Sequence, residues 1–164
     1  MRKTLFPLLA LCLLLSGCGE TPAADASAEF FAMDTVMRLE TPGLSDPAAV
    51  TAGRDAVETL ESLLSRTDGG SEISRLNGAD GQETPLSYPT AALLAAAKDY
   101  SLATGGAFDA TIAPVMDAWG FTTASPHVPD AGTLSALLPL VDSAALTVSV
   151  PAPGEDGSAQ LAPG

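Results

Sequence analysis

The spacing of apolar residues predicts a first long helix over residues 47–64. Its apolar side chains recur at spacings of seven, three and four, which places them on one helical face: Val50, Val57, Leu60 and Leu64. Asp46 fits the N-cap position, because its carboxylate can accept a hydrogen bond from a free backbone amide, and Pro47 fits the first helical position. We expect this helix to end at about Leu64 or Ser65.

A second long helix is predicted over residues 87–103. Pro89 lies in its first turn, and Gly105 follows its end, as is typical of helix boundaries. The alanine-rich face within residues 91–97 suits close packing against a sheet. A short helical turn is also expected over residues 71–77, between the two long helices.

Two segments have the alternation of a strand. Residues 30–40 combine β-branched and aromatic residues with local alternation, and residues 146–150 alternate apolar with hydroxyl side chains. Asp130 or Thr133 is expected to cap a short helix that runs through Leu138. The pattern predicts an α+β fold, in which helices pack on a mostly antiparallel sheet that contains both strands.

The first residues have the pattern of a targeting segment. In residues 1–17, Arg2 and Lys3 precede an apolar run that is too short to span a bilayer. Leu-Ser-Gly before Cys18 resembles a lipoprotein signal-peptidase box, in which this cysteine becomes the acylated N-terminus of the mature protein. We therefore expect an extracytoplasmic lipoprotein held at the membrane by its acyl chains. The alternative is an ordinary secretory signal that is cleaved nearby.

The regions beside the predicted domain have little periodicity. Residues 18–29 consist mainly of Ala, Ser, Thr, Pro and acidic residues, and we interpret them as a flexible tether. Residues 151–164 are rich in Gly, Pro and acidic residues, and we interpret them as a tail, or as an unfinished hairpin whose second strand is absent. No disulfide is expected, because Cys12 lies in the removed segment and Cys18 would be acylated.

The charge balance excludes one class of partner. The chain has 7 Lys and Arg against 20 Asp and Glu, and removal of Arg2 and Lys3 leaves 5 against 20, a net charge of −15. Proteins that bind nucleic acids contact phosphates through Lys and Arg, so we expect no nucleic-acid partner. An acidic surface also repels anionic lipids, which leaves membrane attachment to the anchor.

The most specific stretch is TGGAFDATIAPVMDAWGF at residues 104–121. Gly105 and Gly106 permit positive φ and allow the backbone to approach a ligand closely. Asp109 can accept hydrogen bonds from a ribose or a base while the preceding amides face the same ligand. Equally, an Asp after two glycines is typical of a turn or a helix cap. The aromatic residues of the stretch also fit an ordinary core: Phe108, Trp119 and Phe121.

The remaining residues exclude most mechanisms that depend on His or Cys. His127 is the only histidine, and we expect it to be exposed. There is no zinc-type cluster, no Ser-His-Asp order and no phosphate-binding P-loop. Carboxylates, hydroxyls and backbone amides remain, and these suit Mg²⁺-assisted chemistry on a pyrophosphate.

Three ordered motifs resemble one family. The stretch at residues 104–121 is similar to the signature T-G-G-A-F-D-x-T-x-x-P followed by W-G-F of the FAD:protein FMN transferases, the ApbE family. FAMDT at residues 31–35 and SRTDGGSEISRLN at residues 65–77 resemble two further segments of the same family, in the same order. The resemblance covers residues 30–150, the N-terminal half of such a protein.

The resemblance implies an activity and a set of site residues. A member of this family splits the pyrophosphate of FAD, transfers FMN to a Thr or Ser of a target flavoprotein and releases AMP, with Mg²⁺ on the phosphoryl oxygens. The positions that match FAD-binding positions of the family are Met33, Thr67, Ala107, Phe108 and Asp109. Asp34 replaces a glycine of the family, and Thr67 replaces a common aromatic residue, which lowers the expected flavin affinity.

The resemblance also implies that part of the fold is missing. The Mg²⁺ ligands and a glycine-lysine motif lie in the C-terminal half of the family, and no matching segment follows Val150. We therefore expect a truncated ApbE-like (T-fold-like) fold, with the Mg²⁺ ligands outside this chain. The alternative function is a catalytically incomplete exported lipoprotein that binds flavin or only folds. In either case, we expect residues 146–150 to form an unpaired edge strand and the chain alone to be poorly soluble.

Overall fold

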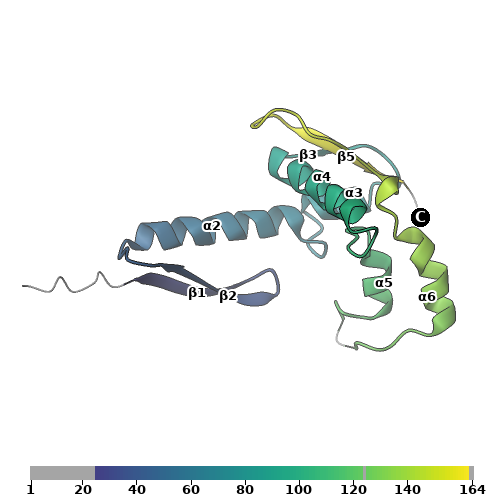
Figure 1. The fold of residues 1–164 in the computed structure, drawn as a ribbon, viewed down its shortest axis with the longest axis horizontal. Coiled ribbons are helices and arrows are strands. Elements are labelled where there is room, and N and C mark those ends of the chain that lie inside the picture. Colours follow the sequence, from purple (N-terminus) through teal and green to yellow (C-terminus); the bar gives the residue numbers. More distant parts are fainter. Residues whose placement is uncertain (1–24, 124, 163–164) are drawn as a thin grey trace, which may run out of the picture. The chain divides into compact units, whose positions relative to one another are not determined.

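The computed structural model describes residues 25–123 and 125–162. The predicted targeting segment at residues 1–17 and the acylated Cys18 lie outside the described residues. The chain divides into two compact units, residues 1–56 and 57–164, and each is described here by itself. The boundary falls inside helix α2, Pro47–Leu64 (Figure 1).

The N-terminal unit is built on a β-hairpin. Strand β1, Ala26–Ala32, pairs antiparallel with β2, Thr35–Thr41, so that Met33 and Asp34 form a two-residue turn. Both turn residues have positive φ, 51° and 57°, as the inner residues of a type I′ hairpin turn require. Asp tolerates this conformation better than most residues, which explains how Asp34 can stand in place of a glycine.

This hairpin corrects two predictions. The single strand expected over residues 30–40 is wrong, because the chain reverses direction at Met33 and Asp34. The tether expected over residues 18–29 is wrong from Ala26 onward, because strand β1 begins there. The turn escaped notice because neither of its residues is a glycine, the usual indication of a type I′ turn.

The start of helix α2 packs in the same unit. The Asp46 carboxylate accepts a hydrogen bond from the Ala48 amide at 2.9 Å, which confirms the predicted cap. A side chain at Gly53 would come within 3.0 Å of Leu39 on β2, so the glycine allows the helix to lie close to the hairpin. The Arg54 guanidinium lies over the Phe30 ring, 5.7 Å from its centroid. The helix ends at Leu64, as predicted.

The C-terminal unit contains a three-stranded antiparallel sheet in the order β3-β5-β4. The strands are β3, Thr84–Leu86, β4, Leu146–Ser149, and β5, Gly157–Leu161. The predicted unfinished hairpin is therefore wrong, because β5 lies within residues 151–164 and is the central strand, paired with both neighbours. Its sequence, GSAQL, lacks the β-branched and aromatic residues that identify strands.

Two helices, α3, Glu72–Asn77, and α4, Tyr88–Ala103, pack against this sheet. Their bounds agree with those predicted from the sequence to within about one residue. The buried apolar cluster takes residues from both helices and all three strands: Leu76, Leu86, Ala91, Leu146 and Ala159. A Cβ at Gly157 would come within 2.9 Å of the Ala91 Cβ, so helix α4 and strand β5 approach closely through small residues. The predicted close packing of the alanine-rich face is confirmed at Ala91.

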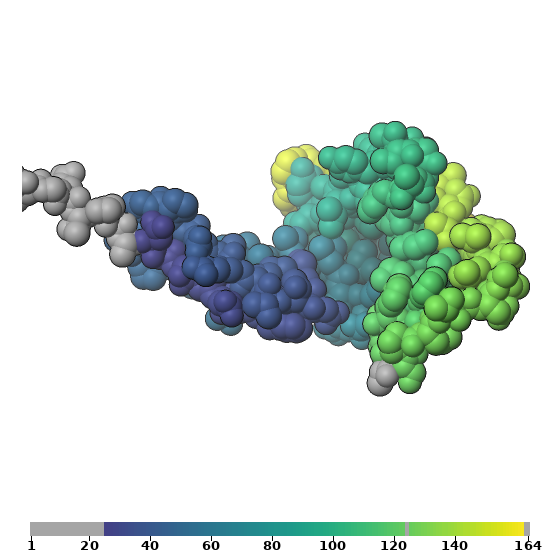
Figure 2. Space-filling view, turned by 60° about the horizontal axis from the view of Figure 1, so that its bottom comes forward, coloured from purple at the N-terminus to yellow at the C-terminus, as the bar shows by residue number. Residues whose placement is uncertain are grey.

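The remaining elements follow the signature stretch. Helix α5, Ala113–Ala118, and helix α6, Ala131–Leu137, pack together (Figure 2), and two short 3-10 helices, η1, Leu138–Leu140, and η2, Ser143–Ala145, lead into β4. Asp130 caps α6 by accepting a hydrogen bond from the Thr133 amide at 2.9 Å. Of the two caps considered, Asp130 is therefore the correct one.

The predicted fold class is confirmed as α+β with antiparallel sheets. The expectation of one sheet is wrong, because the hairpin and strand β4 belong to different sheets. His127 is exposed, as predicted. Within the described part of the chain, no helix is both long enough and apolar enough to cross a bilayer.

Candidate functional site

The loop between α2 and α3 is shaped by serine hydroxyls. The Ser65 hydroxyl accepts hydrogen bonds from the amides of Thr67 and Asp68 at 3.3 and 3.1 Å. The hydroxyls of Ser71 and Ser74 both donate to the Ser65 carbonyl. Ser71 also caps α3, because its hydroxyl accepts a hydrogen bond from the Ser74 amide at 3.0 Å. These serines hold the loop and leave Thr67 exposed.

A buried carboxylate connects α3 to α4. Glu72 accepts hydrogen bonds from the Ser87 amide at 3.0 Å and the Ser87 hydroxyl at 2.9 Å. Burial raises the pKa of Glu72, but the hydrogen bonds from Thr90 and Ser87 outweigh burial and lower the pKa below its ordinary value. The ionised carboxylate therefore fixes the two helix starts to each other.

The two glycines of the signature stretch end helix α4. Gly105 and Gly106 have φ values of 62° and 82°, so the predicted positive φ is confirmed. A Cβ at either position would meet no atom within 4 Å in the described chain. The conformation, rather than close packing within this chain, therefore requires glycine at both positions.

The amides of this turn are used within the chain. The amides of Gly105 and Gly106 donate to helix carbonyls at 3.2 and 2.9 Å. The Ala107 amide donates to the Thr104 carbonyl at 3.3 Å, and the Phe108 amide donates to the Thr104 hydroxyl at 3.2 Å. The expectation that these amides face a ligand is wrong for this structure. The Phe108 side chain remains 48% exposed.

Asp109 is the centre of a polar cluster. One carboxylate oxygen accepts hydrogen bonds from the Thr111 amide and hydroxyl at 2.8 and 2.7 Å. The other lies within 3.1 Å of the Ser143 amide and of the hydroxyls of Ser143 and Ser101. The cluster joins helix α4, the signature turn and η2. Of the two interpretations of Asp109, this geometry favours the structural one, because both oxygens already have several donors.

These hydrogen bonds control the ionisation of Asp109. Burial alone would raise the pKa of the carboxyl, but the hydrogen bonds from Ser143, Thr111 and Ser101 together outweigh burial. They lower the pKa from 3.8 to about 2. The carboxylate is therefore fully ionised near neutral pH.

An ion pair joins the first loop to the signature stretch. Arg66 Nη2 lies 2.5 Å from Asp117 Oδ1 on α5. The Nε and Nη1 atoms of Arg66 are buried and have no hydrogen-bond acceptor among residues 25–123 and 125–162. An unsatisfied buried donor costs about 1 to 3 kcal/mol, so the contacts among the described residues leave the guanidinium in an unfavourable state. The sequence alone does not indicate this pair, because its two residues lie 51 positions apart.

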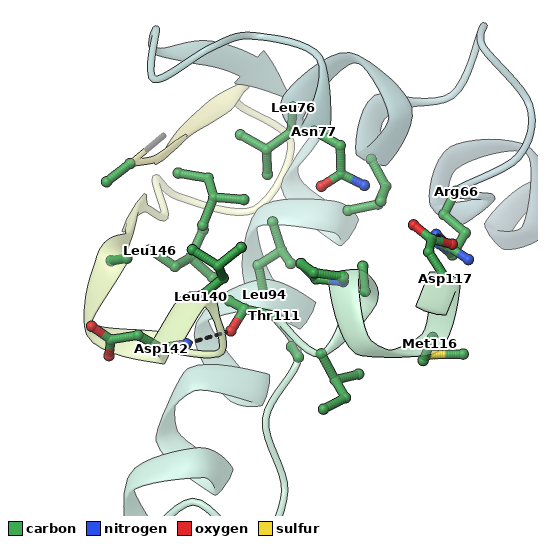
Figure 3. Close-up of a pocket in the computed structure, with 18 of the residues that line it drawn as sticks. Arg66, Leu76, Asn77, Leu94, Thr111, Met116, Asp117, Leu140, Asp142 and Leu146 are labelled. Carbon is green, nitrogen blue, oxygen red and sulfur yellow. Dashed lines mark hydrogen bonds and ion pairs between the residues drawn. The ribbon is translucent and has the colours of Figure 1, made fainter. Parts of the chain in front are cut away.

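A hollow of about 830 Å³ lies beside this ion pair in the C-terminal unit (Figure 3). Its apolar lining comes mainly from α3, α4, α5, η1 and β4: Ile73, Leu76, Leu94, Met116, Leu140 and Leu146. Polar groups at the hollow include Arg66, Asn77, Asp117 and Thr111, whose hydroxyl accepts a hydrogen bond from the Asp142 amide at 2.8 Å.

The five residues predicted to bind FAD, all of them described, do not line this hollow. Their chain neighbours Arg66 and Ala110 do. Met33 lies in the hairpin turn of the N-terminal unit, so its place in a common site stays a prediction. The other four lie in the C-terminal unit: Thr67, Ala107, Phe108 and Asp109.

Carboxylates of the described residues do not form a metal centre. In residues 25–123 and 125–162, no three or more His, Cys, Asp or Glu residues are grouped so that they could hold a metal ion. Two acidic residues near the hollow already have partners, since Asp117 pairs with Arg66 and Asp142 accepts a hydrogen bond from the Ala144 amide at 2.8 Å.

Comparison with known sequences identifies related proteins. The sequence model of the ApbE family matches residues 33–161. A curated relative, the FAD:protein FMN transferase of Klebsiella pneumoniae (strain 342), is 32% identical over 142 residues. This match covers 79% of the present chain and 40% of the relative.

Solved structures show the same fold. The ApbE protein of Thermotoga maritima matches with a TM-score of 0.73 at 19% identity, and the flavin transferase ApbE of Vibrio cholerae with 0.68 at 24%. The apo flavinyl transferase ApbE of Pseudomonas stutzeri matches with 0.67 at 22%. In all three cases the match covers 85% of the present chain and 45 to 46% of the solved chain. The chain thus spans less than half the length of these relatives.

Proposed function

The chain belongs to the ApbE family, and from this we propose that it is the N-terminal part of an FAD:protein FMN transferase. The observation that carries the proposal is the match over residues 33–161, which includes, in chain order, the second and third motifs and the last three residues of the first. The proposed substrates are FAD and a Thr or Ser hydroxyl of a target flavoprotein. The proposed products are the flavinylated protein and AMP.

The proposed reaction is a phosphoryl transfer. The acceptor oxygen forms a bond to the phosphorus of the FMN portion, the bond from that phosphorus to the bridging oxygen breaks, and AMP leaves with the bridging oxygen. The acceptor hydroxyl releases its proton to solvent. Such a reaction depends mainly on positioning and on stabilising negative charge. Mg²⁺ would supply charge stabilisation, but the described residues offer no grouped ligands for it, so its ligands are proposed to lie elsewhere.

The residues of this chain are proposed to position the flavin. Thr67 and Ala107 are exposed, Phe108 is 48% exposed and Met33 is 41% exposed, so each can contact a ligand without rearrangement of the core. The Asp109 cluster holds the turn that presents Phe108. We propose that Asp109 contributes to FAD binding chiefly by fixing this turn, since its oxygens already have donors.

A flavin-binding experiment tests this proposal. The full chain is titrated with FAD, and flavin fluorescence is measured for the wild type, Phe108→Ala and Tyr100→Ala. Tyr100 is the matched control, because it is an aromatic residue of the same unit, is 67% exposed and lies outside the proposed site. Phe108→Ala is expected to weaken FAD binding about tenfold through lost stacking, and Tyr100→Ala to leave it unchanged.

Two results would contradict the proposal. One is a folded wild-type chain that does not bind FAD with or without Mg²⁺. The other is equal loss of affinity in both variants. Binding of FAD without FMN transfer, even when a complementary C-terminal half is present, would instead support the second candidate, a flavin-binding protein without activity.

We also propose that the protein is an extracytoplasmic lipoprotein anchored through Cys18. The support is the basic and apolar leader and the Leu-Ser-Gly sequence before the cysteine. Cys18→Ser is expected to move the protein from the membrane pellet to the soluble exported fraction. An unmodified wild-type N-terminus in mass spectrometry would contradict the proposal.

A further inference from the structure

The C-terminal unit has a small buried apolar cluster beside the hollow. Its buried apolar cluster has five residues. Two of them, Leu76 and Leu146, also form part of the wall of the 830 Å³ hollow. Figure 3 shows Leu76, Leu94, Leu140 and Leu146 around this space, and they come from α3, α4, η1 and β4. The hollow therefore has the composition of one side of a protein core.

We propose that this hollow is the docking surface for the C-terminal half of an ApbE-type chain. The inference rests on the family membership behind the proposed function. The solved relatives are more than twice as long as the region they share with this chain, so they carry further residues that can pack against the shared part. In the C-terminal unit, the hollow is an apolar surface of a suitable kind for such packing.

The position of strand β5 supports this occupant. Leu161, the last residue of β5, and Ala162 both line the hollow. In a relative that continues beyond β5, the next segment therefore starts beside this apolar surface. A short connection is sufficient for packing of that kind, since consecutive elements usually lie next to each other.

The Arg66–Asp117 pair indicates that a docked segment must supply a hydrogen-bond acceptor as well as apolar side chains. Arg66 lines the hollow, and its Nε and Nη1 atoms have no acceptor within the described residues. Asp117 holds only one nitrogen of the guanidinium. The docked half therefore presents apolar side chains to the leucines and a carbonyl or carboxylate oxygen to Arg66, after a small movement of the side chain.

Two leucines of η1 provide a matched pair of variants. Leu140 lines the hollow and is 38% exposed, whereas Leu138 does not line it and is 57% exposed. Both are on the same short helix, and neither is buried, so Asp at either position leaves the closed core intact. Only Leu140→Asp places a charge in the proposed interface, where desolvation without a partner is costly.

The experiment measures binding of the full chain to a complementary half. The partner is the part of the Klebsiella pneumoniae relative that lies beyond the matched region, produced as a separate chain or co-expressed. We expect a one-to-one complex by analytical ultracentrifugation, and hydrogen-exchange protection over residues 110–117 and 139–146. Leu140→Asp is expected to weaken binding at least about a hundredfold, and Leu138→Asp less than about threefold.

Several outcomes would overturn the inference. Equal binding of both variants, or protection confined to other residues, would place the interface elsewhere. A dimer of the chain alone that Leu140→Asp dissociates would assign the hollow to a second copy. Protection of the hollow by FAD alone would assign it to flavin. None of these readouts uses FMN transfer, so failure of the docking inference is distinguishable from failure of the proposed function.

Arg66→Gln provides a second variant that does not depend on the leucines. It keeps a polar side chain but removes the guanidinium donors. We expect it to weaken the complex by about tenfold and to leave the exchange pattern of the isolated chain unchanged. Unchanged affinity would show that the docked half brings no acceptor to Arg66, which would contradict that part of the inference.

Discussion

Asp109 and Arg66, two charged residues of the C-terminal unit, differ in how fully the chain satisfies their hydrogen bonds. Asp109 has five donors within 3.1 Å, and each comes from the chain itself. Arg66 has one carboxylate partner and two buried nitrogens without acceptors in the described residues. The carboxylate of the signature turn is thus fully hydrogen-bonded by its own chain. The guanidinium in the wall of the hollow is not, as far as the described residues show.

The largest effect is expected from Asp109→Ala. This change leaves the donors of Thr111, Ser143 and Ser101 without their carboxylate partner, and the loss of several hydrogen bonds to a charged group is expected to lower the free energy of unfolding by about 3 kcal/mol or more. Urea denaturation followed by circular dichroism measures this loss in the free energy of unfolding. Asp130→Ala is the control, because it removes one exposed helix cap and is expected to lower the free energy of unfolding by clearly less. Equal losses would show that the cluster is no stronger than a single cap.

The pH dependence of stability sharpens the same comparison. The pKa of Asp109 is about 2 in the folded chain and 3.8 without the cluster, so folding favours the ionised form. The stabilisation is complete above the unfolded pKa and is lost as the pH falls from about 5 to about 2, by roughly 2 kcal/mol. Asp109→Asn is expected to reduce the slope of unfolding free energy against pH in this window. Glu72 contributes in the same direction and remains in the variant.

The turn glycines provide a smaller effect. Gly106→Ala forces a residue with a Cβ into φ 82° but creates no clash, since a Cβ there meets no atom of the described chain within 4 Å. The expected loss in unfolding free energy is about 1 to 2 kcal/mol, from backbone strain alone. Gly154→Ala, with φ 94° and equally open surroundings, is the matched control and is expected to lose a similar amount. A much larger loss at Gly106 would indicate that the turn needs glycine for a further reason.

Arg66→Met is expected to change the free energy of unfolding of the isolated chain least. Whether it lowers or raises this free energy is the informative result. Removal of the guanidinium breaks a partly exposed ion pair, which is worth at most about 1 kcal/mol, and it also removes two unsatisfied donors. The two effects offset each other, so the unfolding free energy is expected to change by less than about 1 kcal/mol or to rise. A loss comparable to that of Asp109→Ala would show that Arg66 has acceptors in solution.

The helices of this fold could be predicted because their signals are local. Asp46 and Pro47 mark the start of α2, and Ser87 and Pro89 mark the start of α4. The strands were harder, since GSAQL has weak strand propensity and becomes the central strand β5 only through its two neighbours. The hairpin turn at residues 33–34 was missed because Asp34 adopts a conformation in which the usual signal is glycine.

The candidate site could be predicted from the sequence only in part. The motifs identified the signature turn, and the positive φ of its glycines followed from sequence. The role of Asp109 could not be predicted from the sequence, because its partner Ser143 lies 34 residues away. Arg66 and Asp117 are separated by 51 residues, and no periodic pattern connects them. Long-range pairs of polar residues depend on the folded arrangement of elements, which hydrophobic spacing does not encode.

FMN transfer by a reconstituted pair of chains shows most directly whether this chain is part of a flavin transferase. The present chain and the complementary half of the Klebsiella pneumoniae relative are incubated with FAD, Mg²⁺ and a threonine-containing acceptor peptide, and the peptide is analysed by mass spectrometry. We expect an FMN adduct on the threonine that requires both chains, FAD and Mg²⁺. A stable complex that binds FAD and Mg²⁺ but forms no adduct would contradict the claim that this chain is part of a flavin transferase.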